Sequence, residues 1–198
     1  MFFFNKAYIK LHNFIAKGKY MSLGKNSYIS ARSIIYGKKK IKIGTNTIIA
    51  SHSILDSSGR SDIGIHIGNN CIVHEFTFIK AFDGLIKIGN NSTINPFCVI
   101  YGCESGVVIG DGVRIASGCS LVANSHNFDN PNLFIFEQGV TSKGIIVEDD
   151  VWLGSGVKII DGVKIGKGSV IGANSVVTKS IPPFSIAVGV PAVVIKRR

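Results

Sequence analysis

Residues 147–182 read as six consecutive units of six residues: VEDDVW, LGSGVK, IIDGVK, IGKGSV, IGANSV and VTKSIP. Each unit opens on an aliphatic residue, and its fifth residue is Val, Ser or Ile. A period of six fits no α-helix, which has about 3.6 residues per turn, but it fits a short strand followed by a tight turn. Alternate residues of a strand share a face, so the fifth residue of one unit and the first of the next point into a core. The pattern predicts a parallel β-helix in which three units make one triangular coil.

Aliphatic residues that open units extend this pattern towards the N-terminus and predict about seven coils. The coils open at Leu23, Ile43, Ile67, Ile88, Ile109, Val147 and Ile165. These starts differ by 20, 24, 21, 21, 38 and 18 residues, so every insertion falls after the third strand of a coil, at one corner. Insertions in repeat proteins collect on one side, which is often the binding side. The largest insertion is an extended loop, 127–146, whose apolar residues we expect to pack on a neighbouring subunit.

The repeats divide the chain into an N-terminal segment (1–22), the β-helix (23–182) and a C-terminal tail (183–198). Apolar residues of the first segment fall at helical spacing among lysines, and predict a short helix that closes the open end of the solenoid. The alternative is a basic helix (residues 1–20) that lies on an anionic membrane. We expect the tail to cover the strand edge of the last coil.

Composition limits the partners and the compartment. The chain has 198 residues and a net charge of +10, which predicts an anionic partner. Among anionic partners such as cofactor phosphates, acidic glycans, membranes and nucleic acids, nucleic acid is the least favoured, because no nucleic-acid-binding motif is present. Cys71, Cys98 and Cys119 occupy inward slots without a CxxC motif, which favours a reducing cytoplasm. We expect neither a signal peptide nor a membrane-spanning stretch, and a cytoplasmic location that includes the inner face of the membrane if residues 1–20 bind there.

Two residues, His126 and Trp152, are unusual for the outward slot that they occupy. The imidazole of His126 lies next to the large insertion and could accept a proton from a hydroxyl. The indole of Trp152 exposes a large apolar area unless something covers it. The cover could be a neighbouring subunit or a ligand, and the sequence does not decide between them. We interpret His52, His66 and His74 as structural or solvated.

The chain resembles the hexapeptide-repeat (left-handed β-helix) acyltransferases, close to the maltose, galactoside and polysaccharide O-acetyltransferase branch. The residues that carry this resemblance are NSHNFDNP (124–131), 138–183 and VGVPAVVIK (188–196). The resemblance implies an all-β, left-handed parallel β-helix and a homotrimer. It also implies direct transfer of an acetyl group from acetyl-CoA to a sugar hydroxyl, without an acyl-enzyme or a metal. The unusual N-terminal segment favours a glycan precursor of surface polysaccharide as acceptor.

The resemblance also implies roles for individual residues. His126 matches the general base, and the backbone N–H of Ser155 matches the donor to the oxyanion. Asn95 matches an acceptor-binding residue, although an ordinary turn asparagine is an equal alternative. Thr178, Lys179 and Lys196 match positions near the nucleotide end of CoA, whereas Val193 stands where the family has a basic residue. We assign Trp152 to the acyl-CoA site, provided that a ligand covers it.

Two inferences combine the roles that the resemblance implies with the spacing of the residues. Ser155 and Ala173 lie 18 residues apart, so they stack at about 4.8 Å and offer backbone groups to the amides of pantetheine. His126 and Ser155 belong to different corners, so the site is expected between adjacent subunits of a closed ring. The group that orients His126, either Asp129 or a backbone carbonyl, stays open. The alternatives are acylation of an amino sugar or another small acceptor, and a non-catalytic scaffold. A zinc hydratase is disfavoured because Leu121 and Pro131 stand where histidines would be required.

Overall fold

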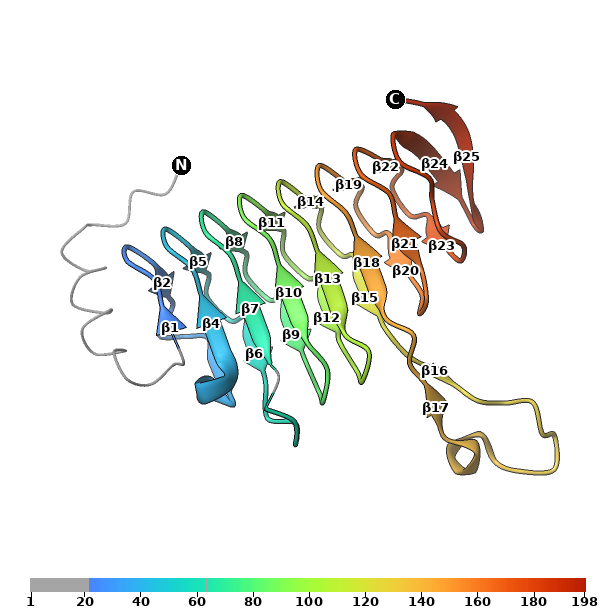
Figure 1. Ribbon diagram of the computed structural model, residues 1–198, viewed down its shortest axis with the longest axis horizontal. Coiled ribbons are helices and arrows are strands. Elements are labelled where there is room, and N and C mark those ends of the chain that lie inside the picture. The colour runs from blue at the N-terminus through green and yellow to red at the C-terminus, as the bar shows by residue number, and fades with distance from the viewer. Residues whose placement is uncertain (1–21, 63) are drawn as a thin grey trace.

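The computed structural model describes residues 22–62 and 64–198, and these form an all-β solenoid of about seven coils (Figure 1). Three long parallel sheets run along the axis and form its three faces. Face 1 consists of β1 (Ser22–Leu23), β4 (Ile41–Ile43), β7 (Ile65–Ile67), β10 (Ile86–Ile88), β13 (Val107–Ile109), β18 (Ile145–Val147) and β21 (Lys164–Ile165).

Face 2 consists of β2 (Tyr28–Ile29), β5 (Ile48–Ile49), β8 (Ile72–Val73), β11 (Thr93–Ile94), β14 (Arg114–Ile115), β19 (Trp152–Leu153), β22 (Val170–Ile171), β24 (Ser185–Gly189) and β25 (Ala192–Arg197). Face 3 consists of β3 (Ile34–Tyr36), β6 (Ile54–Asp56), β9 (Phe78–Lys80), β12 (Val99–Tyr101), β15 (Ser120–Val122), β20 (Lys158–Ile159) and β23 (Val176–Val177). We call the turn from face 1 to face 2 corner 1, the turn from face 2 to face 3 corner 2, and the connection back to face 1 corner 3.

The register of face 1 confirms the spacing read from the sequence. Its partners are offset by 20, 24, 21, 21, 38 and 18 residues, from the pair Ser22 and Lys42 to the pair Ile146 and Lys164. Faces 2 and 3 repeat these offsets, so the extra residues all leave the coil at corner 3. Insertions therefore change the loops at one corner and leave the stacking of the strands intact.

The core is a column of aliphatic side chains inside the triangle. Ile65, Ile100 and Leu121 are fully buried, and each such side chain stabilises the fold by about 1.5–3 kcal/mol relative to exposure. The cysteines at the predicted inward slots, Cys71 and Cys98 among them, are also buried and free.

The ends of the described chain differ from the regular coils. The tail adds β24 in parallel beside β22, and β25 then folds back antiparallel on β24. The edge of face 2 is thus covered by the chain's own tail. The predicted helix of the N-terminal segment lies within 1–21, outside the described residues. Within the described ranges, no helix has the length and apolar composition to cross a bilayer.

The large insertion forms an arm that projects from corner 3 (Figure 1). Its base is an antiparallel hairpin of β16 (Ser125–His126) and β17 (Val140–Thr141), and its tip contains the 3-10 turn η2 (Ile135–Gln138). A second 3-10 turn, η1 (Lys38–Lys40), lies at corner 3 of the first coil. Phe128, Phe134 and Phe136 of the arm are all more than two-thirds exposed, at 70%, 72% and 77%. The expected contact of this arm with a neighbouring subunit remains a prediction.

Candidate active site

Corner 1 has backbone donors that side chains of the next coil already bind. The N–H of Thr45 donates to Oδ1 of Asn69 in the next coil at 2.7 Å. The same bond recurs from Asn69 to Asn90 at 2.9 Å, from Asn90 to Asp111 at 2.6 Å and from Asp111 to Asp149 at 2.8 Å. A parallel ladder of side-chain amides joins Asn26, Asn46, Asn70 and Asn91. The polar atoms of these two ladders satisfy one another, so the ladders have a structural role.

Corner 2 has the opposite character. The N–H of Asn174 donates to the carbonyl oxygen of Ser155 at 2.8 Å, and the N–H of Gly156 donates to that of Ser117 at 2.9 Å. In the described part of the chain, however, the N–H groups of Ser155 and Ala173 themselves have no acceptor. Both residues are exposed, and they follow positions that pair directly in β19 and β22. Their donors therefore form an open row along the axis, at a spacing of about 4.8 Å.

A glycine keeps this row compact. A Cβ atom at Gly154 would lie 2.7 Å from the backbone nitrogen of Ala173, so a side chain there would push the two coils apart. The open row suits an extended ligand that carries carbonyl groups, because each carbonyl could accept one backbone N–H. A flexible ligand with several amide carbonyls along its length would match these donors.

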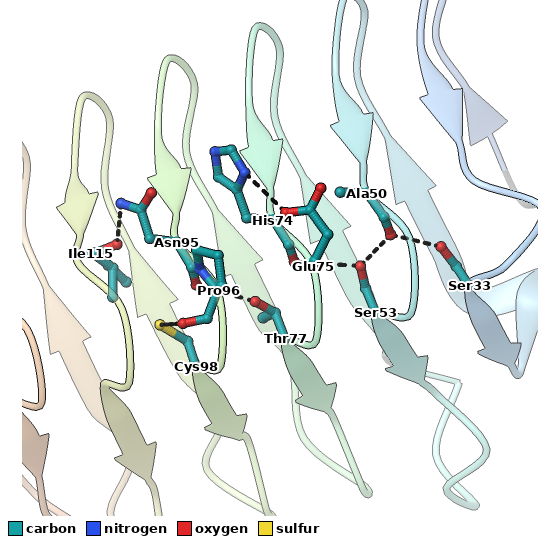
Figure 2. A network of polar contacts seen from close by, with 10 residues as sticks. All are labelled: Ser33, Ala50, Ser53, His74, Glu75, Thr77, Asn95, Pro96, Cys98 and Ile115. Atoms are coloured by element: carbon teal, nitrogen blue, oxygen red, sulfur yellow. Dashed lines mark hydrogen bonds and ion pairs between the residues drawn. The ribbon is translucent and has the colours of Figure 1, made fainter. Parts of the chain in front are cut away.

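Trp152 and Asn95 lie on or beside this corner. Trp152 is 55% exposed on the outer side of face 2, where Arg114 and Val170 are its neighbours. Asn95 belongs to corner 2 two coils before Ser155, about 10 Å along the axis. Its Nδ2 donates to the carbonyl oxygen of Ile115 at 2.9 Å, which leaves Oδ1 directed away from the backbone (Figure 2).

His126 lies at the base of the arm, in β16, opposite Val140 of β17. Its side chain is exposed and makes no hydrogen bond or ion pair with any other described residue. Asn127 fixes the hairpin instead, because its Nδ2 donates to the carbonyl oxygen of Gln138 at 2.9 Å and its Oδ1 accepts from Thr141 at 2.7 Å. Neither Asp129 nor a backbone carbonyl of the described ranges orients the imidazole. His126 is at corner 3 and Ser155 at corner 2, so one protomer presents them on different edges.

The three residues expected near the nucleotide come from two different parts of the chain. Thr178 and Lys179 are exposed just after β23, at the end of face 3. Lys196 is exposed in β25, opposite Ile186, on the extension of face 2. None of the ion pairs among the described residues includes Lys179 or Lys196.

Sequence reasoning missed a cluster on corner 2 beside Asn95. His74, which we interpreted as structural or solvated, places Nδ1 3.5 Å from Oε2 of Glu75 (Figure 2). The ring of Phe76, in the same turn, stacks on that of Phe97 in the next coil. The available signal was the spacing of these phenylalanines, which stand 21 residues apart at the same position of successive coils. Within the described ranges, no three His, Cys, Asp or Glu side chains gather as metal ligands.

Comparisons with known proteins agree with this architecture. Residues 144–179 match the model of the family described as bacterial transferase hexapeptide (six repeats). A probable acetyltransferase of Mycobacterium tuberculosis is 33% identical over 92 residues, which are 46% of this chain and 31% of that protein. The chain thus spans about a third of the length of this curated relative.

Solved structures match the chain over nearly its full length. AntD, an N-acyltransferase from Bacillus cereus solved with dTDP and 3-hydroxybutyryl-CoA, is 25% identical, with a TM-score of 0.64 and coverage of 99% of this chain and 89% of AntD. A maltose O-acetyltransferase from Clostridium difficile 630 is 22% identical, with a TM-score of 0.56 and coverage of 97% and 85%, and this likeness shows the fold alone.

The repeats, the three parallel faces and the open corner define a hexapeptide-repeat β-helix protein. The family model, the curated relative and the structural neighbours together support a hexapeptide-repeat acyltransferase.

Proposed function

We propose that this protein is a CoA-dependent O-acetyltransferase that moves an acetyl group from acetyl-CoA to a hydroxyl of a sugar. The observation that carries the proposal is the pair of open backbone donors at Ser155 and Ala173. They lie on successive coils of corner 2, whereas the donors of Thr45, Asp111 and Lys167 at corner 1 are bonded to side chains. A pantetheine arm with its two amides fits such a row.

The donor lies along corner 2 in this proposal. The N–H of Ser155 points at the thioester carbonyl and stabilises the oxyanion that develops there, an effect of roughly 3–4 kcal/mol. Trp152 contacts the acyl-CoA from face 2. Thr178, Lys179 and Lys196 lie near the nucleotide end, where cations meet phosphates. The structure of AntD was solved with an acyl-CoA bound, and this supports an acyl-CoA as the donor.

The chemical step is a direct attack. The imidazole of His126 takes the proton of the sugar hydroxyl while the hydroxyl oxygen bonds to the thioester carbon. The tetrahedral intermediate then collapses, its carbon–sulfur bond breaks, and the imidazolium returns the proton to the sulfur of CoA. Acetyl ester and free thiol are the products, so no group is left on the protein.

The site forms between subunits of a homotrimer. His126 of one protomer meets Ser155 of its neighbour, because the two residues occupy different edges of a single β-helix. A closed three-fold ring provides this contact three times. Asn95 binds the acceptor, which we propose to be a glycan precursor of surface polysaccharide, acetylated in the cytoplasm or at the inner face of the membrane.

A second candidate is acylation of an amino sugar. AntD is an N-acyltransferase, and its structure matches 99% of this chain. This similarity favours an amine acceptor. A thiol-release assay with acetyl-CoA, run over matched sugars and amino sugars, separates the two. Turnover of a sugar without an amine supports the first proposal, and turnover of amino sugars alone supports the second. Absence of CoA binding by calorimetry would contradict both and leave a scaffold role.

A further inference from the structure

Corner 2 carries a column of stacked rings that ends abruptly. The ring of His52 lies 5.1 Å from that of Phe76 with an interplanar angle of 6°, and Phe76 lies 5.2 Å from Phe97 with an angle of 2°. These spacings are close to the separation of strands, so the column runs parallel to the axis. All three residues have a positive φ, between 58° and 62°, a conformation that is unusual for a bulky side chain.

The next position of the column is vacant. Gly118 follows Phe97 along the axis, and a Cβ atom there would have only the backbone of Gly156 nearby, at 3.9 Å. One coil further on, a Cβ atom at Gly156 would collide with Oδ1 of Asn174, so that side chain fills the space over Gly156. The result is a slot one ring deep, with the free face of Phe97 on one side and the amide of Asn174 on the other. Phe97 is 62% exposed.

Polar groups surround this slot. Asn95 precedes Phe97 in the same turn, and its Oδ1 has no hydrogen bond to any residue that the structure describes. Glu75 belongs to the coil before that of Asn95, two coils from Gly118, and has one carboxylate oxygen near His74 (Figure 2). The open N–H of Ser155 lies one coil above the slot, about 5 Å along the axis. Hydrogen-bond acceptors and an aromatic face at one place match a ring that has hydroxyl groups at its edge and C–H bonds on its face.

We infer that the acceptor's pyranose ring stacks on the free face of Phe97, over Gly118, with its hydroxyls towards Asn95. This inference rests on the proposed function and extends it, because it assigns the ring a place and predicts preference for cyclic sugars over open-chain polyols. It also brings a hydroxyl of the ring within one coil of the Ser155 donor. The stack on Phe97 would replace the ring that the column lacks.

The test fills the slot without disturbing the turn. Gly118→Asn places a side chain where the sugar would lie, and asparagine accepts this backbone, since Asn174 has the same conformation with φ 57°. The matched control is Gly112→Asn in the same coil at corner 1, where four other coils already carry asparagine. Phe97→Ala is a second variant that removes the platform. The probes are methyl glycosides of glucose, galactose, mannose and N-acetylglucosamine, with sorbitol and thymidine beside them, measured by saturation-transfer NMR on the full protein.

We expect at least one methyl pyranoside to bind the wild type, and its Kd to rise at least tenfold in Gly118→Asn and in Phe97→Ala. Gly112→Asn should bind as the wild type does, and all variants should bind CoA equally. The inference is overturned if no pyranoside binds the wild type, if thymidine or sorbitol binds instead, or if Gly118→Asn leaves the Kd unchanged. Dissociation of an oligomer by Gly118→Asn would also overturn it, since a partner subunit would then cover the slot.

The two proposals fail in different ways. Binding of a pyranoside in this slot without acetyl transfer to any sugar contradicts the proposed function and leaves the sugar site standing. Acetyl transfer whose KM for the sugar is the same in Gly118→Asn and in the wild type contradicts the sugar site and leaves the proposed function standing.

Discussion

The backbone N–H of Asn174 donates to the carbonyl oxygen of Ser155 at 2.8 Å, and this bond ties to the next coil a residue whose own N–H has no acceptor among the described residues. The donor at Ser155 is therefore held by the next coil before any ligand arrives. Preorganised donors of this kind contribute most to stabilising developing negative charge, because they need no reorganisation during the reaction.

Replacing the base should stop the reaction and leave the assembly intact. His126→Ala is expected to lower kcat by about 10²–10⁴-fold, because the acceptor hydroxyl loses its proton acceptor. The exposed side chain makes no hydrogen bond or ion pair with the described residues, so stability should change little. Thiol release measures turnover, and calorimetry with CoA measures donor binding. His66→Ala on face 1 is the control, and equal loss of activity in both variants would argue against a specific role for His126.

Removing one backbone donor should slow the reaction without unfolding the coil. Ser155→Pro deletes the N–H of Ser155, and the turn tolerates proline because Pro96 occupies the same position two coils earlier. We expect kcat to fall by about 10²–10³-fold. Ser51→Pro, at the same turn position of an earlier coil, should retain full turnover. Wild-type kcat in Ser155→Pro would remove this N–H from the mechanism.

A mixing experiment tests whether the site is shared between subunits. Neither His126→Ala nor Ser155→Pro should be active alone. Trimers assembled from an equal mixture should regain about a quarter of the wild-type activity, since a site needs His126 from one protomer and Ser155 from its neighbour. The variants are unfolded and refolded together, and size-exclusion chromatography verifies assembly. Activity no higher than that of the separate variants would place both residues in one protomer's site.

Asp56 should make the stability of the second and third coils depend on pH. Burial opposes ionisation of this carboxylate, but hydrogen bonds from Ser58 and the ammonium of Lys80 outweigh burial and lower its pKa below the ordinary value. A group with a lowered folded-state pKa stabilises the fold above its unfolded pKa, and this contribution is lost as the pH falls through the folded value. Asp56→Ala should therefore reduce the free energy of unfolding by about 1–3 kcal/mol near pH 7, and less in acid.

Urea unfolding at pH 7 and pH 3 measures this difference. Asp129→Asn serves as control, because Asp129 is exposed and has no hydrogen-bond partner in the described ranges. A loss of stability in Asp56→Ala that is the same at both pH values would show that the shape of the side chain matters and its charge does not.

The coils could be predicted from the sequence because each unit of six residues needs an aliphatic side chain at the same inward position. An inward aliphatic such as Ile100 or Leu121 must recur once per strand, and its spacing therefore gives the register of the sheets directly. The burial of Cys98 and Cys119 followed from the same rule. The arm could not be derived this way, because β16 and β17 pair with each other and not with the coils.

The candidate site was predictable only in part. The stacking of Ser155 and Ala173 follows from their separation, but the difference between corners 1 and 2 depends on where each N–H finds an acceptor. That requires coordinates, since the acceptor for Asp111 comes from Asp149, 38 residues away. The column of stacked rings could not be predicted from the sequence either. Phe76 and Phe97 have a positive φ, which is disfavoured for phenylalanine.

The arm leaves the solenoid at corner 3 and returns to it without altering the pairing of β13 with β18 or of β15 with β20. Its length and composition are consequently uncoupled from the rise of the coils. Substitutions in the arm can alter the surroundings of His126 while the backbone N–H groups of corner 2 keep their spacing. A scaffold with this separation can acquire a new acceptor preference through changes in one hairpin, at little cost in folding stability.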